Sequence, residues 1–519
     1  MPGFDLRLGI DVGGTNTDAV VLDRDDQLLA KAKVAGTPDV TSGIDDAIAT
    51  VLASPDVYPD RITHVMLGTT HATNAILERR KLGRVAVIRI GSPATHAVRP
   101  LFGWPEDLRQ VLSVGETIVG GGIEFDGREL APFDAEAVVR FLGKVGSQAD
   151  GIAITSVFSP VSARHELLAQ EVVRHELGEI HVSLSHQIGS VGLLERENAT
   201  VLNAALVGVA REVTAAVQNS LRSHGLEPVT FFAQNDGTLM ALDYAVQYPV
   251  LTIGSGPANS IRGAAFLTRT TDALVMDVGG TSCDIGMLIA GFPRESSQGV
   301  ELGGVRTNFR MPDLVTIAVG GGTILHGEPR ALRLGPDSVG FRIQQMALVF
   351  GGSTPTLTDA AVAAGRAELG SCPPPNSIGP LATEALRQAD SMLADAIDRV
   401  KTSRADCPLI AVGGGSVLLP KSIPGVSEIH RPEHFEVANA IGATIAVVGG
   451  QVDRIVQLGV GGRAEALAQA TDEARQQAIL AGADPSAVEV IEIEEIPLAY
   501  LTTPAVRLRV KAVGPLGTN

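Results

Sequence analysis

The sequence contains few cysteines and few aromatic residues. Its three cysteines, Cys283, Cys372 and Cys407, are odd in number and widely spaced, so they predict neither a disulfide framework nor a CxxC metal site. This usage favours a reducing, cytoplasmic location. Phe, Trp and Tyr together make up 4% of the chain, whereas Ala, Val, Leu, Ile and Gly are plentiful. Such a composition suits layered α/β domains better than an aromatic-rich β sandwich.

The chain also lacks an excess of positive charge. It has 41 Lys and Arg against 58 Asp and Glu, a formal net charge of -17, which argues against nucleic acid or an anionic membrane as a partner. No apolar run approaches the length of a membrane span. The first strand-like residues follow Met1 so closely that we expect no signal peptide. The length of 519 residues predicts roughly two to four domains.

Several catalytic motifs are missing. There is no G-x-x-x-x-G-K-[ST] loop, no H-E-x-x-H pair and no G-x-S-x-G elbow, which excludes Walker-type NTPases, common zinc hydrolases and α/β-hydrolases. The segment "GSGPAN" at 254–259 begins like a dinucleotide fingerprint, but Asn259 stands where the third glycine belongs. Any phosphate-binding signal must therefore lie in other glycine-rich segments.

One glycine-rich phrase occurs twice, as "DVGGTNTDAV" at 11–20 and as "DVGGTSCDIG" at 277–286. Each copy lies between two β-prone runs, which predicts a hairpin with its turn at the paired glycines. A single pair of glycines between strands would indicate only a tight turn, with no phosphate-binding role. Its recurrence, with an Asp before and a Thr after the glycines, predicts a duplicated domain with a phosphate site between the halves. Asp11 and Asp277, at the strand ends, could hold Mg²⁺ there.

Two further glycine-rich strand ends resemble each other, "IAVGGGTIL" at 317–325 and "IAVGGGSVL" at 410–418. Such a turn lets a phosphate or a flat base lie against the backbone. It can equally serve only to pack a strand closely against a helix. We weigh the two interpretations evenly for the first segment and favour a functional one for the second.

Taken in order, eight segments resemble one known family across about residues 6–450. They are "GIDVGGTNTDAVVLD", "LGTTHATNAILERRKLGRVAVI", "SLSHQIG" with "ERENATVLNAAL", "GSGPANSIRGAA", "MDVGGTSCDIG", "TIAVGGGTI", "TLTDA" and "AVGGGSVLLP" with "EVANAIGA". The chain is similar to the A-type, ATP-binding subunit of the hydantoinase/oxoprolinase family, within the actin/Hsp70/sugar-kinase superfamily. It departs from the pattern at Val315, where the family commonly has a His before the Thr.

The resemblance implies an α/β fold of two duplicated, ribonuclease H-like lobes around an ATP cleft. It implies an enzyme that uses ATP and Mg²⁺ to activate a cyclic amide, such as a hydantoin, oxoproline or lactam, for ring opening. It also implies a second, B-type or other, subunit and an oligomeric assembly. A small-molecule kinase of the same superfamily and a nucleotide-switched structural or regulatory protein remain alternatives.

The resemblance also implies the site residues. Catalytic and metal-binding roles fall on Asp11 and Asp277, with Asp11 nearer the transferred phosphoryl group. The expected nucleotide-binding residues lie in three loops: Gly13, Gly14, Thr15, Asn16 and Asp18; Gly279, Gly280 and Thr281, with Asp284 beside them; and, on the adenosine side, Gly413, Gly414, Gly415, Ser416, Asn439 and Gly442. Asp18 and Asp284 could equally cap their hairpins.

Other polar residues have two interpretations each. Thr69 or Thr70 could cap the helix that follows or face the cleft, and His71 is more typical of a hydrogen-bonded His than of a ligand. Thr200 and Asn203 share a face of an expected helix over 195–223, where they could line a substrate pocket or bond a neighbouring element. By default, Asp359 would cap the helix that follows it. Cys283 is expected to be buried packing.

We expect three parts in the chain. Residues 1–190 form the N-terminal lobe, with the first hairpin and a helix over 160–178. Residues 191–450 form the second lobe, with the second hairpin and the adenosine-side turns. Residues 451–519 form a small α+β domain, whose strand pattern V-E-V-I-E-I-E-E-I alternates as a half-exposed strand does.

Overall fold

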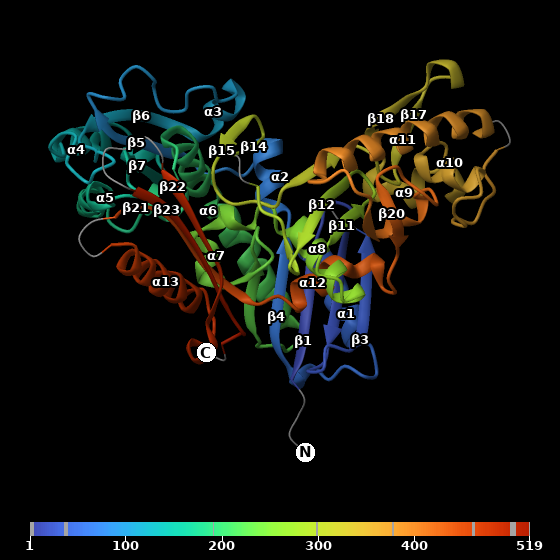
Figure 1. Cartoon of the computed structure of the whole chain (residues 1–519). Coiled ribbons are helices and arrows are strands. Elements are labelled where there is room, and N and C mark those ends of the chain that lie inside the picture. The colour runs from blue at the N-terminus through green and yellow to red at the C-terminus, as the bar shows by residue number, and fades with distance from the viewer. Residues whose placement is uncertain are drawn as a thin grey trace.

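The computed structural model describes residues 5–35, 40–189, 191–296, 299–375, 378–458, 462–498 and 505–517. Within them, the strands form three large sheets and two short ribbons (Figure 1). The largest sheet has nine strands, in the order β22 (Glu489–Leu498), β23 (Ala505–Gly514), β21 (Val448–Gln457), β10 (Leu239–Ala241), β9 (Val229–Ala233), β4 (Ile62–Thr69), β1 (Leu6–Val12), β2 (Asn16–Leu22) and β3 (Leu28–Ala35).

The second sheet has the order β13 (Phe292–Pro293), β12 (Cys283–Ile289), β11 (Ala273–Val278), β19 (Cys407–Val412) and β20 (Val426–His430), with β16 (Leu314–Ile317) also paired to β12. The third sheet has the order β6 (Ser113–Gly120), β5 (Val85–Ser92), β7 (Gly151–Ser156) and β8 (His181–Leu184). The ribbons pair β14 (Val300–Leu302) with β15 (Val305–Thr307) and β17 (Thr323–His326) with β18 (Arg333–Ser338).

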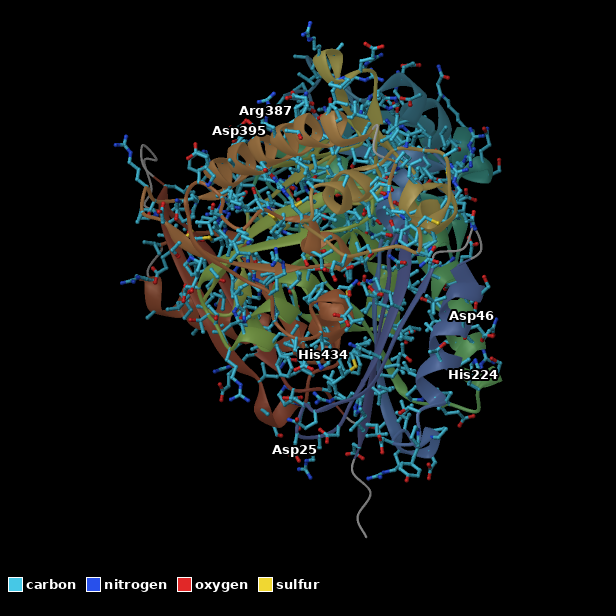
Figure 2. All side chains as sticks on the ribbon, turned by 90° about the vertical axis from the view of Figure 1, so that its right-hand side faces the viewer. Asp25, Asp46, His224, Arg387, Asp395 and His434 are labelled. Atoms are coloured by element: carbon cyan, nitrogen blue, oxygen red, sulfur yellow. The ribbon has the colours of Figure 1, made fainter. Side chains whose placement is uncertain are left out.

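Thirteen α-helices lie in the described residues. They are α1 (Val40–Leu52), α2 (His71–Glu78), α3 (Glu106–Leu112), α4 (Ala135–Val145), α5 (Arg164–Leu177), α6 (Leu193–Ser223), α7 (Leu242–Gln247), α8 (Ser255–Thr268), α9 (Ile343–Met346), α10 (Leu357–Ala363), α11 (Gly379–Val400), α12 (Ala438–Thr444) and α13 (Gly462–Leu480). Figure 2 shows that Arg387 and Asp395 of α11 face outward, and that Asp46 of α1 lies close to His224 beyond the end of α6.

The two sheets that carry the repeated phrase share one local plan. β1 pairs antiparallel with β2 and parallel with β4, and β11 pairs antiparallel with β12 and parallel with β19. In register, Asp11 faces Asp18 and Asp277 faces Asp284. The common plan confirms the predicted hairpins and the duplicated lobes. β1 is buried along almost its whole length, which is why its sequence reads as an apolar run rather than an alternation.

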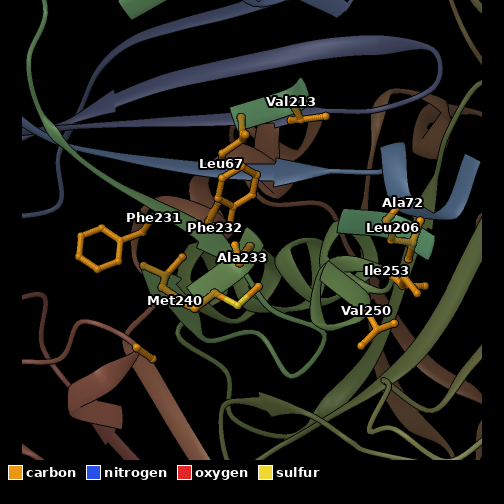
Figure 3. Packing of buried hydrophobic residues seen from close by; sticks show 14 of the residues in the cluster. Leu67, Ala72, Leu206, Val213, Phe231, Phe232, Ala233, Met240, Val250 and Ile253 are labelled. Atoms are coloured by element: carbon orange, nitrogen blue, oxygen red, sulfur yellow. The ribbon is translucent and has the colours of Figure 1, made fainter. Parts of the chain in front are cut away.

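The main hydrophobic core lies between the nine-stranded sheet and α6. Leu67 of β4 and Phe232 of β9 pack with Leu206 and Val213 of α6 (Figure 3). By length and composition alone, α6 is apolar enough to cross a membrane, which the sequence analysis did not foresee. However, 67% of its most apolar stretch is buried inside the protein, as in the core helix of a globular fold.

The lobes meet where α8 crosses α12. α12 packs on β1 and β2, and α8 packs on β11 and β12. A Cβ at Gly442 of α12 would lie 1.8 Å from the carbonyl oxygen of Asn259, and a Cβ at Gly263 of α8 would lie 1.8 Å from that of Ala438. Glycine is therefore required on both helices, because the two backbones touch directly.

The sheets do not follow the expected division of the chain at residues 190 and 450. β9 and β10 extend the sheet that contains β1, and the boundary at 450 falls inside β21. The predicted C-terminal helix and strands exist as α13, β22 and β23, but β23 pairs with β21 and so continues the nine-stranded sheet. Strand patterns indicate that a segment is extended, but they do not identify its partner strand.

The close approach of α8 and α12 predicts a large difference between two glycine-to-alanine substitutions. Gly442→Ala should lower the free energy of unfolding by about 1–3 kcal/mol or more, because the new methyl group overlaps the backbone of α8. Gly143→Ala is the matched control: a Cβ there meets no atom within 4 Å. In α4 this change should raise stability by up to about 1 kcal/mol. Urea denaturation midpoints measure both effects, and equal midpoints would contradict the described crossing.

Candidate functional site

The turns of the two hairpins face a single cavity of about 610 Å³, a volume typical of small-molecule sites. Both turns are closed alike: the Gly13 N–H donates to the Asn16 carbonyl at 3.0 Å, and the Gly279 N–H donates to the Ser282 carbonyl at 2.9 Å. A Cβ at Gly280 would lie 3.0 Å from Cγ2 of Thr15. The two copies of the phrase therefore lie against each other, although they are far apart in sequence.

Most of the predicted site residues line this cavity. They are Asp11, Gly13, Gly14, Thr15, Asn16, Asp18, Asp277, Gly279, Gly280, Asp284, Gly413, Gly414, Gly415 and Asn439. Three predicted residues do not: Thr281 is exposed, Ser416 is fully buried, and Gly442 packs against α8. Gly442 is needed at the helix crossing, because a side chain there would overlap the backbone of α8.

Four carboxylates meet at the cavity, and each is held by a hydrogen-bond donor. Asn439 Nδ2 donates to Asp11 Oδ2 at 2.9 Å and to Asp18 Oδ2 at 3.0 Å. Asn439 thus links the two acids of the first hairpin, and its expected adenosine-side contact stays a prediction. In the second lobe, Asp277 accepts the hydroxyl of Ser260 at 2.5 Å, and Asp284 accepts that of Thr316 at 2.5 Å.

Positive charge at the cavity comes from one lysine. Lys33 Nζ lies 2.7 Å and 2.9 Å from the two carboxylate oxygens of Asp18 and donates to the Glu436 carbonyl at 3.0 Å. No other Lys or Arg belongs to the described residues that line the cavity. The cavity therefore has more negative than positive groups, which favours a ligand that arrives with a cation.

The pKa of all four carboxyl groups is raised. Burial and the charge of Asp18 raise the pKa of Asp11 to about 6, with a smaller contribution from Asp277 across the cavity. Burial, with a further contribution from Asp277, raises the pKa of Asp284 to about 6. Burial also raises the pKa of Asp18 and Asp277, against the lowering effects of Lys33 and Ser260. The carboxylates therefore repel one another across the lobe interface.

Two glycines make room for the acids. A Cβ at Gly68 would lie 2.0 Å from Oδ1 of Asp11, and a Cβ at Gly413 would lie 2.1 Å from Oδ1 of Asp277. Gly413 also has φ +78°, a left-handed conformation that favours glycine. At Gly68, inside β4, and at Gly413, just beyond β19, any side chain would displace a carboxylate.

The remaining glycine-rich turn, at 319–323, mainly supports the second hairpin. The Gly321 N–H donates to the Gly279 carbonyl at 3.0 Å, and the Gly322 N–H donates to the Gly280 carbonyl at 2.7 Å. A Cβ at Gly320 would lie 2.8 Å from the backbone at Gly280. Close packing therefore explains this turn, although Gly321 also reaches the cavity lining.

Sequence reasoning missed four residues that bind the acids: Lys33, Asn259, Ser260 and Thr316. Lys33 stands opposite Asp18 in the β2–β3 register, so the hairpin pattern could have located it. Asn259 Nδ2 donates to Asp11 at 3.3 Å, and Ser260 follows it on α8. Both lie in "GSGPANSIRGAA", one of the eight segments that carry the family resemblance, but the sequence assigned neither residue a role.

The lesser candidates have mainly structural roles. Thr200 donates to the Arg196 carbonyl within α6, and Asn203 donates to Ser183 Oγ and to the Gln247 carbonyl, so neither lines the cavity. Asp359 is not the residue that caps α10. Thr356 is the N-cap, and Asp359 completes a capping box with it.

Residues at the start of α2 lie at the edge of the site. Thr70 lines the cavity and precedes α2, but its side chain makes no capping bond. Its hydroxyl donates to the Val12 carbonyl at 3.3 Å. His71 Nδ1 lies 2.6 Å from the Thr69 hydroxyl, and burial lowers its pKa. Cys283 is buried, as predicted.

The donor set fits a magnesium ion that arrives with phosphates. Among the described residues, no group of three or more His, Cys, Asp or Glu side chains is arranged to enclose a metal by itself. Mg²⁺ bound with a nucleotide needs only one or two carboxylates, because phosphate oxygens and waters complete its octahedron. Asp11 and Asp277 are the acids that would supply these carboxylates from opposite lobes, and a divalent cation would relieve their repulsion.

Comparison with known proteins gives consistent matches. The family profile described as hydantoinase/oxoprolinase matches residues 196–474, and the hydantoinase/oxoprolinase N-terminal region matches residues 7–177. The chain is 28% identical over 387 residues to the caprolactamase subunit alpha of Pseudomonas jessenii, covering 69% of this chain and 54% of that protein. It is 27% identical over 399 residues to the acetophenone carboxylase gamma subunit of Aromatoleum aromaticum, covering 69% and 53%.

The chain thus spans about half the length of the curated relatives it matches. Among solved structures, the ATP-dependent caprolactamase from Pseudomonas jessenii has a TM-score of 0.78 at 21% identity, covering 98% of this chain and 88% of that one, so the two share a fold. Because the profiles match both the N-terminal hairpin region and the second lobe, this chain belongs to the hydantoinase/oxoprolinase family.

Proposed function

We propose that the chain is the nucleotide-binding component of an ATP-dependent enzyme that phosphorylates a cyclic amide and so prepares it for ring opening by water. The observation that carries this proposal is the single cavity into which both acid-tipped turns project. The named activities of the relatives support the use of ATP. Because those relatives are called alpha and gamma subunits, we further propose that a second subunit takes part.

In this proposal, the glycine turns bind the phosphates. Gly13–Gly14 and Gly279–Gly280 expose backbone at the cavity from opposite sides, where N–H groups can contact phosphate oxygens without side-chain interference. Mg²⁺, held by Asp11 and Asp277, would neutralise charge on the β- and γ-phosphates. Lys33 holds the Asp18 carboxylate in place and opposes the rise in its pKa that burial causes. Phosphoryl transfer needs little more than this positioning and charge stabilisation.

The acids can also handle the proton of an attacking water. An amide carbon is a poor electrophile because nitrogen donates electrons to the carbonyl. Transfer of a phosphoryl group to the amide oxygen makes this carbon electrophilic enough for attack by water. Water then adds to the activated carbon and gives a proton to a nearby base. The ring C–N bond breaks as its nitrogen takes up a proton, and hydrolysis of the resulting acyl phosphate by a second water releases phosphate and the ring-opened acid. Asp11 is the candidate for this base: without a bound cation, burial and the charge of Asp18 raise its pKa to about 6.

The first test is amide-dependent ATP turnover. Phosphate release from ATP should rise when hydantoin, 5-oxoproline or a lactam is added, and the ring-opened acid should form in equal amount. The assay is run with the chain alone and with any copurifying subunit. A phosphorylated end product would indicate a kinase instead, turnover that depends on bicarbonate and a ketone would indicate a carboxylase, and substrate-independent release would indicate a nucleotide switch.

The second test is substitution of the paired acids. Asp11→Asn and Asp277→Asn should each reduce ATP turnover by about 10²–10⁴-fold, because the metal anchor or base is lost. Asp25→Asn is the matched control, since Asp25 is exposed in the β2–β3 turn (Figure 2). All three variants should melt near the temperature of the parent chain. Full turnover in either cavity variant would contradict the assignment.

The third test addresses the space that Gly68 leaves for Asp11. Gly68→Ala should displace the Asp11 carboxylate and reduce turnover by about 10²-fold, as a misplacement of roughly 1 Å does in catalytic sites. Gly143→Ala serves as the control, and kcat measured at saturating ATP separates the effect from weaker binding. A Gly68→Ala variant with parental kcat would show that the position of Asp11 does not limit the reaction.

A further inference from the structure

A second cavity, of about 500 Å³, lies between the four-stranded sheet and β21. We call it the lateral cleft. It shares no lining residue with the cavity between the hairpins. Ser159 and Pro160 line it just beyond β7, His186 and Gln187 line it just beyond β8, and Gln451 lines it from β21.

The position of the lateral cleft is typical of ligand sites. β5, β6, β7 and β8 are all parallel, and the chain passes from β6, on one side of β5, to β7 on the other. In open parallel sheets, ligands bind beyond the carboxyl ends of the strands, near such a reversal of strand order. Ser159 and His186 stand at these carboxyl ends.

A buried acid fixes the orientation of His186. Glu166 is fully buried and accepts four hydrogen bonds: from His186 Nδ1 at 2.6 Å, from the His186 N–H at 3.0 Å, from the Ser156 N–H at 2.8 Å and from the Ser185 hydroxyl at 2.5 Å. Burial alone would raise the pKa of Glu166, but the bonds from His186 and Ser185 and the charge of Arg196 lower it. Glu166 is therefore an ionised acceptor.

Because Nδ1 bonds to the ionised Glu166, the neutral form of the His186 imidazole carries its proton on Nδ1 and has Nε2 as a hydrogen-bond acceptor. No described residue bonds to Nε2. Arg196 Nε donates to the Ser185 hydroxyl at 3.0 Å and Arg196 Nη2 donates to the Ser156 carbonyl at 2.7 Å, so the support beneath His186 is itself fixed. The ring is thus presented to the cleft by a rigid network.

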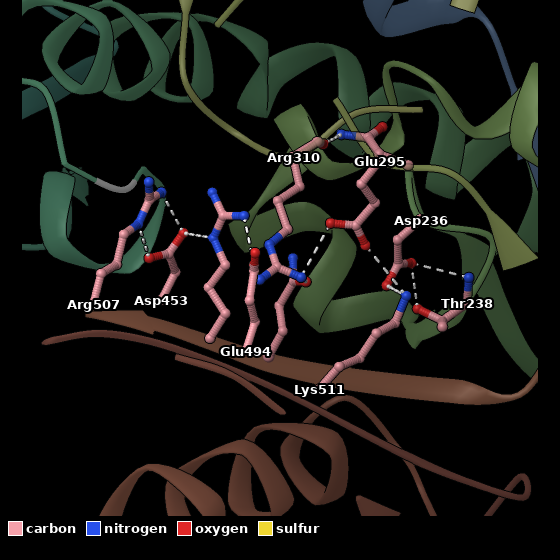
Figure 4. Close-up of polar contacts among 11 residues, drawn as sticks. Asp236, Thr238, Glu295, Arg310, Asp453, Glu494, Arg507 and Lys511 are labelled. Carbon is pink, nitrogen blue, oxygen red and sulfur yellow. Dashed lines mark hydrogen bonds and ion pairs between the residues drawn. The ribbon is translucent and has the colours of Figure 1, made fainter. Parts of the chain in front are cut away.

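The charges around the lateral cleft are already paired. Lys511 binds Asp236 at 2.7 Å, Arg507 binds Asp453 at 2.7 Å, and Arg310 lies 3.1 Å from Glu295 (Figure 4). The other charged lining residues also have opposite charges bound to them: Asp126 with Arg128, and Arg454 with Glu473. A charged ligand would meet no side chain whose charge is still unpaired. An uncharged ligand would need only hydrogen bonds.

We propose that the lateral cleft is a second ligand site, which binds a small uncharged molecule with adjacent N–H and C=O groups, as in a cyclic amide. The N–H donates to His186 Nε2. The carbonyl accepts from the Tyr244 hydroxyl or the Gln187 carboxamide, which line the cleft and bond no described side chain or backbone atom. The choice of an amide as the ligand class rests on the proposed function, whereas the uncharged character follows from the paired lining.

Binding is tested by calorimetric titration of the full chain, without nucleotide, with δ-valerolactam and hydantoin. We expect saturable binding of at least one of them and none of 5-aminovaleric acid, the charged, ring-opened form of the lactam. Absence of saturable binding, or equal binding of the charged acid, would overturn the inference. Binding that remains in the Asp11→Asn variant separates this site from the nucleotide cavity, and binding lost there would also overturn it.

His186→Asn tests the acceptor without removing the support. The carboxamide of Asn can keep the bond to Glu166 but has no atom at the position of Nε2, so affinity should fall at least about tenfold. His175→Asn, at an exposed position on α5, should bind as the parent does. Unchanged affinity in His186→Asn would refute the assignment. If that variant does not fold, histidine ¹⁵N signals of the parent chain decide instead: an Nε2 shift on lactam addition supports the site, and its absence refutes it.

These results are independent of the proposed reaction. Lactam binding that depends on His186, without lactam-stimulated ATP turnover, would support the second site and contradict the proposed function. Lactam-stimulated ATP turnover without His186-dependent binding would support the proposed function and contradict the second site.

Discussion

Two consecutive residues of α8 connect the acids of both lobes. Asn259 donates to Asp11 of the first hairpin, and Ser260 donates to Asp277 of the second. Because burial raises the pKa of both acids, with repulsion from neighbouring carboxylates adding to it at Asp11, their placement requires hydrogen-bond donors in fixed positions. A single helical turn supplies both donors, so the separation of the two carboxylates depends on the position of one rigid element.

The position of α8 depends in turn on glycine. Gly263 and Gly442 bring the backbones of α8 and α12 into contact, and α12 carries Asn439, the donor shared by Asp11 and Asp18. Gly68 and Gly413 then leave the space that the carboxylates occupy. The polar site is thus possible only because side chains are absent at the surrounding positions, and the chain's abundant glycine is in part a consequence of this packing.

Local patterns predicted much of this arrangement. Paired glycines between β-prone runs are enough to specify both hairpins, and their repetition is enough to predict facing lobes. The partners of β23 could not be predicted, because alternation along a strand does not indicate which strand lies beside it. Likewise, the spacing of Thr200 and Asn203 gave their helical face correctly, but whether that face met a cavity or another chain segment depended on contacts distant in sequence. Asn259 and Ser260 were missed because their motif indicates the family but not which of its polar side chains reach the acids of the site.

The helix crossing also limits how the lobes can move. If α8 slid along α12, larger side chains would replace glycine at the point of contact, so shear displacement is opposed by steric overlap. Rotation about the crossing keeps the glycines in place and is the motion that the contact permits. The crossing therefore has the geometry of a pivot: because Asn259 and Ser260 lie on α8 beside it, a rotation of the lobes about this contact would swing the phosphate-facing turns while the pivot end stays fixed.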